Sequence, residues 1–199
     1  VGMPYTILMP VIARDVLHGG PHTLGFLMAG SGAGALVGAF YLASRSTVVG
    51  LGVWIARASF VFGVGLMLMS LSHEFWLSLS MVIIVGFGMM VQLASSNTIL
   101  QTIVEDDKRG RVMSFYAMAF MGTAPFGSLL SGCLASAVGT LTTLFIGGCC
   151  CVAGSIFFAV NLPSLRKVVH PIYVKKGIIR EIAAGIGSAT DLTAPPEEY

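Results

Sequence analysis

The sequence predicts an all-α integral membrane protein built as a helical bundle. Hydrophobic residues make up 55% of the 199-residue chain and charged residues only 10%, whereas soluble domains are roughly 25% charged. Two long runs, from Phe75 to Val104 and from Val112 to Leu165, contain no Asp, Glu, Lys or Arg, and a membrane-spanning helix needs only about 20 apolar residues. These runs are continuous, whereas membrane β-strands alternate over about 10 residues. Helices are therefore favoured.

Apolar runs separated by polar connectors predict five full transmembrane helices after a truncated first one. The first apolar segment, residues 1–12, is too short to span a bilayer. We therefore expect the chain to be the C-terminal piece of a longer protein. Pro163 is expected to end the last helix. The predicted organisation is a transmembrane bundle over residues 1–165 and a partly disordered cytoplasmic tail over 166–199. Within the bundle, the predicted helices cover about 1–12, 23–43, 51–71, 76–100, 113–137 and 141–162.

Small residues recur in the second and fifth predicted helices. In the second helix, three glycines four residues apart share one face, and small residues at this spacing let two helix backbones approach closely. In the fifth, glycines and a proline permit a bend and close packing. A glycine-lined substrate path is the alternative to packing in the second helix. The residues predicted to serve helix packing are Gly30, Gly34, Gly38, Gly122, Pro125 and Gly127.

The fourth predicted helix is the most polar in its second half. Gln92, Ser96 and Asn97 lie in an otherwise apolar segment, and polar side chains within the membrane favour the bundle interior or a wet cavity over lipid. Gln92 and Ser96 are four residues apart and share a face. We predict that these three residues bind a substrate. Interhelical hydrogen bonding without a ligand is the alternative.

The basic residues lie almost entirely on one side of the predicted membrane. One set of connectors holds only Arg14, and the other set, with the tail, holds nine basic residues. Cytoplasmic loops carry the excess of Lys and Arg, so the C-terminus is predicted to be cytoplasmic. The nine residues are Arg45, Lys108, Arg109, Arg111, Arg166, Lys167, Lys175, Lys176 and Arg180.

The charged connector at residues 105–111 separates the fourth and fifth helices. Arg109 and Arg111 lie at the start of the fifth helix, where the macrodipole disfavours cations, so they need other partners. Nearby acids such as Asp107, or carbonyl groups at neighbouring helix ends, are candidates. Two hypotheses follow: these arginines hold the cytoplasmic face shut, or they only fix the topology of the chain.

Other site classes receive no support from the residues. The four cysteines lie in apolar segments, and consecutive helical residues point about 100° apart, which favours packing over a shared metal. His18 and His22 share a loop without a third ligand. No nucleophile or phosphate motif accompanies them. A net charge of +2 does not suggest nucleic acid. We expect no enzyme activity, cofactor, metal or nucleic-acid partner.

Several motifs resemble those of a known transporter family. They are Asn-x-x-Leu-Gln at residues 97–101, RGRVMS at 109–114, Gly-x-x-Pro-x-Gly at 122–127 and ARDVL at 13–17 after a proline. The chain resembles the C-terminal six-helix half of a major facilitator superfamily transporter, within the bacterial branch of enterobactin-type and bacilysin-type exporters. One departure concerns Arg45: the family's loop has the form Leu-Ala-Asp-Arg-x-Gly, and here Ser44 replaces the acid and Thr47 the glycine. A charge-relay role for Arg45 is therefore not expected, and it remains a candidate for gating or topology.

The resemblance implies a secondary transporter in the bacterial inner membrane. It would export a small organic molecule, such as a siderophore, drug or metabolite, by alternating access between this half and a missing N-terminal six-helix half. The first and fourth helices would line the cavity. Protons are a candidate coupling ion, but no acidic residue lies in a predicted span, which places any carrier carboxylate in the missing half. The alternative is a non-transporting helical membrane subunit or an inactive transporter fragment.

Overall fold

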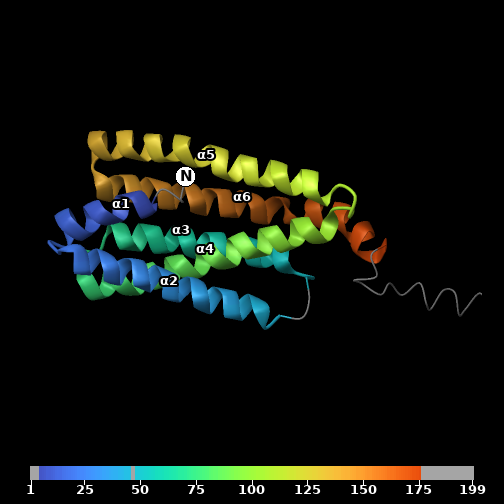
Figure 1. Ribbon diagram of the computed structural model, residues 1–199, viewed down its shortest axis with the longest axis horizontal. Coiled ribbons are helices and arrows are strands. Elements are labelled where there is room, and N and C mark those ends of the chain that lie inside the picture. Colours follow the sequence, from blue (N-terminus) through green and yellow to red (C-terminus); the bar gives the residue numbers. More distant parts are fainter. Residues whose placement is uncertain (1–4, 46–47, 176–199) are drawn as a thin grey trace, which may run out of the picture. The chain divides into compact units, whose positions relative to one another are not determined.

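A computed structural model describes residues 5–45 and 48–175 of the chain, and these residues form helices without strands. The predicted all-α membrane fold is therefore confirmed (Figure 1). Within the described residues, five helices are long and apolar enough to cross a membrane. Their bounds are α2 Pro21–Ala43, α3 Leu51–Ser70, α4 Phe75–Ile103, α5 Arg109–Val138 and α6 Thr140–Lys175.

The first helical segment is short and changes from an α-helix to a π-helix along its length. The helix α1 covers Tyr5–Val11, and a π-helical turn, η1, continues it over Ile12–Val16. The backbone N–H of Leu17 donates to the carbonyl of Ile12 at 3.0 Å, which closes this wider turn. The first helix was predicted to end at about residue 12. The chain instead remains helical through Val16.

Glycines bring α2 and α4 into backbone contact. A Cβ atom at Gly34 would overlap the carbonyl oxygen of Ile83, and one at Gly86 would overlap the carbonyl oxygen of Ser31. Gly38 faces the carbonyl of Phe87, with a Cβ distance of 3.0 Å. Because glycine has no side chain, the two helices can approach more closely than larger residues would allow.

The helix α3 lies between α4 and α6, and glycines mark both contacts. A Cβ at Gly88 of α4 would come within 2.9 Å of the Ala58 carbonyl oxygen on α3. On the other side, a Cβ at Gly63 would lie 2.8 Å from the carbonyl oxygen of Gly148 on α6. The Ser155 hydroxyl also donates to the Ala56 carbonyl at 3.2 Å.

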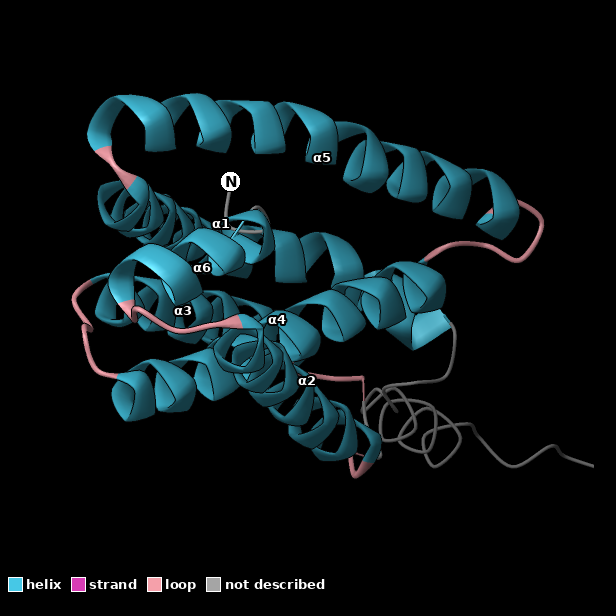
Figure 2. Ribbon diagram, turned by 60° about the vertical axis from the view of Figure 1, so that its left-hand side comes forward, coloured by secondary structure: helices cyan, strands magenta, loops and turns pink. Residues whose placement is uncertain are grey.

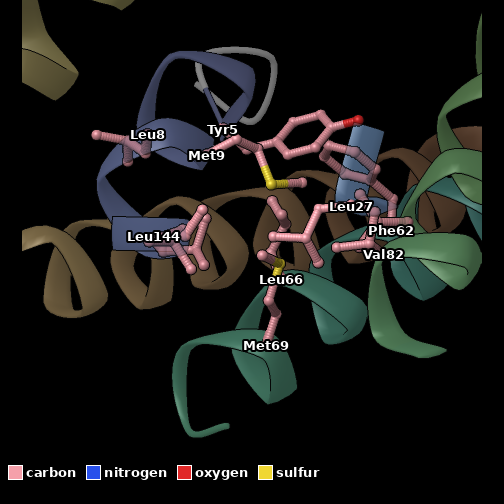
Figure 3. Packing of buried hydrophobic residues seen from close by; sticks show 12 residues of the cluster. Tyr5, Leu8, Met9, Leu27, Phe62, Leu66, Met69, Val82 and Leu144 are labelled. Atoms are coloured by element: carbon pink, nitrogen blue, oxygen red, sulfur yellow. The ribbon is translucent and has the colours of Figure 1, made fainter. Parts of the chain in front are cut away.

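Tyr5 of α1 lies in the apolar core (Figure 3). Its ring packs edge-on against Phe62 of α3, with centroids 5.9 Å apart. The hydroxyl lies 2.9 Å from the Ser31 hydroxyl of α2 and 3.9 Å from the sulfur of Met89 on α4. One side chain therefore contacts three other helices. The buried core comprises Tyr5, Leu8, Met9, Ile12, Ala13, Leu27, Phe62, Leu66, Met69, Val82, Val85 and Leu144.

The helix α5 is the least buried span. It lies at the edge of the bundle (Figure 2), and Ser131 is its single buried residue. Large apolar side chains on it, including Met121 and Phe126, are about three-quarters exposed. A helix that packs so little against its own chain must cover its apolar side chains with lipid or with other protein.

The last helix is longer than predicted. It continues through Pro163 and Pro171 to Lys175, so the expected end at residue 162 is wrong. A proline removes one backbone donor and can bend a helix without ending it. Packing divides the chain into two compact units, residues 1–162 and 163–199. The described part of the second unit is helical, and the rest of the predicted tail, 176–199, lies outside the described residues.

Candidate functional site

Gln92 lines a cavity of about 400 Å³ within residues 1–162. The cavity lies between α3, α4, α5 and α6, and α1, which was expected to line it, contributes no residue. The lining consists of Ile55, Ser59 and Phe62 from α3, Met89, Gln92 and Leu93 from α4, Phe120 from α5, and Cys150, Cys151, Gly154, Ser155 and Phe158 from α6.

Most of this lining is apolar, and a few polar groups face it. The Gln92 amide forms no hydrogen bond with any described residue, so its donors and acceptor are available to a ligand. The Ser155 hydroxyl is already used, because it donates to the Ala56 carbonyl. Small-molecule sites typically combine an apolar lining of about 300–1,000 Å³ with a few polar groups that orient the ligand. The cavity fits that description.

Ser96 and Asn97 follow Gln92 by about one turn of α4. Neither residue lines the cavity. Asn97 accepts a hydrogen bond from the Gln101 amide nitrogen at 3.0 Å, one turn further along α4. Next to them, Ser95 is fully buried, and its hydroxyl has no hydrogen-bond partner among the described residues. Of the three predicted binding residues, only Gln92 therefore lies at this cavity.

Sequence reasoning missed the contribution of α3 and α6. Ser59, Cys150 and Cys151 line the cavity, but the cysteines had been assigned to packing. The apolar run around Cys149–Cys151 gives no sign that one face of α6 lies beside Gln92. The close contact between Gly63 and Gly148 places α6 against α3, and these two helices are far apart in the sequence.

The predicted gating residues lie on an exposed connector and the first turn of α5. The helix begins at Arg109, four residues earlier than predicted, so Arg109 and Arg111 belong to its first turn. Arg109 pairs with Asp106, and Lys108 pairs with Glu105 at 2.6 Å. Arg111 and Asp107 are exposed and form no ion pair among the described residues.

Arg45 lies apart from that connector, at the end of α2. Its guanidinium carbon is 5.4 Å from the centre of the Trp54 ring on α3, within cation–π range. It makes no ion pair in the described ranges, 5–45 and 48–175. The structure therefore places the predicted gating residues in two separate groups, one at the α2–α3 connector and one at the α4–α5 connector.

The predicted packing glycines have contrasting surroundings. Gly30, Gly34 and Gly38 are buried against α4. A Cβ at Gly122 of α5, by contrast, would meet nothing within 4 Å. Pro125 lies inside α5, which continues past it to Val138. Within the described residues, Gly122 has open space where the three α2 glycines have a neighbouring helix.

Comparison with known proteins gives one family match and one curated relative. The family model described as transmembrane secretion effector, of the major facilitator superfamily, matches residues 4–172. The staphyloferrin A transporter of Staphylococcus aureus (strain NCTC 8325 / PS 47) is 26% identical over 161 residues, which cover 80% of this chain and 40% of that protein. The chain thus spans about two-fifths of that relative's length. No solved structure matches the chain.

Proposed function

Because the chain belongs to the transmembrane secretion effector family of the major facilitator superfamily, we propose that it is the C-terminal half of a secondary transporter that exports a small organic molecule. Transport would proceed by alternating access, with this half rocking against an N-terminal six-helix half. The name of the staphyloferrin A transporter makes a siderophore the first substrate class to test. The motifs at 97–101 and 109–114 favour the branch of enterobactin-type and bacilysin-type exporters.

The observation that carries this proposal is the cavity beside Gln92. Its volume, about 400 Å³, suits a small organic molecule or one part of a larger one. The unpaired amide of Gln92 would orient the polar groups of the substrate, and the apolar and aromatic lining would cover the remainder. Ser96 and Asn97, which lie outside this cavity, would act elsewhere along the substrate path.

The glycine contacts suit a transporter whose helices shift against one another. Gly30, Gly34 and Gly38 hold α2 against α4, and the exposed face of α5, including Gly122 and Pro125, would contact the N-terminal half. Gly127, which is half-buried, would serve packing within this half. Arg111, which has no ion-pair partner among the described residues, would pair with an acid of that half and help to close the cytoplasmic face.

The proposed location is the bacterial inner membrane, with a cytoplasmic C-terminus, because basic residues predominate on that side. The described spans contain no Asp or Glu. If a proton gradient drives export, we propose that the carboxylate that carries the proton lies outside these described spans, in the N-terminal half.

The experiment measures export of a labelled siderophore by the full protein in proteoliposomes, with and without a pH gradient. The Gln92→Leu variant removes one hydrogen bond to the substrate, which is worth about 0.5–1.5 kcal/mol, so we expect KM to rise about threefold to tenfold. The control, Asn161→Leu, makes the same change at an exposed amide that donates to its own helix at the Phe157 carbonyl.

Three outcomes would count against the proposal. An unchanged KM in Gln92→Leu would exclude the cavity as the binding site. Transport that is independent of the pH gradient would exclude proton coupling. A full protein that moves no tested siderophore, drug or metabolite would favour the non-transporting alternative.

A further inference from the structure

Two arginines of the α2–α3 region lie beside the same tryptophan. The guanidinium carbon of Arg45 is 5.4 Å from the centre of the Trp54 ring, and that of Arg57 is 5.6 Å from it. The Tyr41 ring packs against Trp54 from α2, with centroids 5.0 Å apart, and also contacts Phe87 of α4 at 6.0 Å. We call Tyr41, Arg45, Trp54 and Arg57 the arginine–tryptophan cluster.

The residues that surround this cluster in the sequence carry no acidic group to balance its positive charge. The sequence contains no Asp or Glu between Asp15 and Glu74. In the described ranges, the ion pairs join Arg14 to Asp15, Lys108 to Glu105 and Arg109 to Asp106. Neither arginine of the cluster takes part in one of them.

Local backbone geometry adds to the positive field. The helix α3 begins at Leu51, three residues before Trp54, with Gly50 at its N-cap and no acidic residue in its first turn. Its N-terminal dipole is positive, and both guanidinium carbons lie within 5.6 Å of the ring centre of Trp54, the fourth residue of that helix. Two cations and a positive helix end repel one another unless an anion joins them.

An exposed apolar strip runs along α3 from the cluster. Phe60 and Val61 follow Arg57 by three and four residues and therefore share its face of the helix, and Leu68 continues that face two turns further on. All three side chains are exposed. A cationic group at the end of an apolar strip matches a phospholipid, with the phosphate at the arginines and an acyl chain along the strip.

We propose that the arginine–tryptophan cluster binds the headgroup of an anionic phospholipid. Arg45 and Arg57 donate hydrogen bonds to the phosphate oxygens. Trp54 holds both guanidinium groups at the membrane interface, where tryptophan is enriched. This site is separate from the cavity beside Gln92, and the proposal does not depend on the transport function.

The test uses tryptophan fluorescence of the full protein with Trp54 as the sole indole, which in this chain requires Trp76→Phe. Quenching by brominated phosphatidylglycerol is compared with quenching by brominated phosphatidylcholine in vesicles of otherwise equal composition. The relative affinity for the anionic lipid is expected to be higher by roughly thirtyfold for two arginines, and to fall about fivefold in Arg45→Gln or Arg57→Gln.

Two further variants act as controls. Arg14→Gln removes an equal charge from an arginine that already has an acidic neighbour, at 4.0 Å in Asp15, and should leave the lipid preference unchanged. Arg57→Lys retains the charge and should retain most of the preference. Thermal unfolding of each variant identifies any that fail to fold. If a variant does not fold, the proposal is judged from the comparison of the two brominated lipids in the Trp76→Phe protein.

Equal quenching by the two lipids would overturn the proposal. The same preference in the Arg45→Gln/Arg57→Gln double variant would also overturn it. If soluble glycerol 3-phosphate relieved the quenching, the ligand would be a soluble anion and the assignment to a lipid would be wrong.

Discussion

At the scale of single residues, Gly34 shows how one missing side chain sets the spacing of two helices. A Cβ there would overlap the backbone carbonyl of Ile83, a group that cannot rotate away. Gly32, two residues earlier, has nothing within 4 Å of the same added atom. The two glycines lie in the same helix and differ only in what they face.

We expect Gly34→Ala to destabilise the protein by about 1–3 kcal/mol, because α2 and α4 must move apart to admit the methyl group. Gly32→Ala should be neutral or slightly stabilising, since alanine is the better helix former. The midpoint of thermal unfolding in detergent, measured for both variants, checks this. Equal midpoints for the two would show that the close contact at Gly34 does not limit stability.

At the scale of helices, α5 has a distinct role because it packs little against its own chain. Its first turn carries Arg109, paired with Asp106, and Arg111, which has no ion-pair partner among the described residues. The exposed pair of Arg109 contributes about 0.2–1 kcal/mol at most. In the proposed transporter, Arg111 would be the residue to make a contact that breaks and reforms during transport.

Replacing Arg111 with alanine is expected to slow export about twofold to fivefold without reducing the amount of protein in the membrane, because one exposed charge contact is lost. Lys108→Ala is the matched control: it removes one positive charge from the same connector, where Lys108 pairs with Glu105. Export rate and membrane insertion are measured together. Equal loss of insertion in both variants would show that these charges act only in topology.

At the scale of the whole molecule, the distribution of basic residues predicts how the chain sits in the bilayer. In a cysteine-free background, His22→Cys reports on the N-terminal end of α2, and Asp107→Cys reports on the connector before α5. An impermeant maleimide added to intact cells should label the first and not the second, and both should react after lysis. The reverse pattern would place the C-terminus outside the cell.

Composition and periodicity predicted the membrane class and the helices. A long charge-free run is typical of a membrane span, and within lipid a continuous apolar segment satisfies its own backbone hydrogen bonds by forming a helix. They also identified Gln92 and the α2 glycines as unusual. They did not predict that α6 passes through Pro163, since a proline in a membrane helix can end it or bend it depending on its neighbours.

Local pattern by itself determined the fold class and the approximate centres of the spans, and it predicts an orientation. These features depend on hydrophobicity and charge along the chain. Only the tertiary structure decided that Gln92 lines one cavity with Ser59 and Cys150 while Ser96 does not. It also decided that Arg45 and Arg57 lie beside the same tryptophan, Trp54. Such contacts depend on how closely two helices approach, and single glycines facing another backbone, such as Gly34 and Gly63, set that distance.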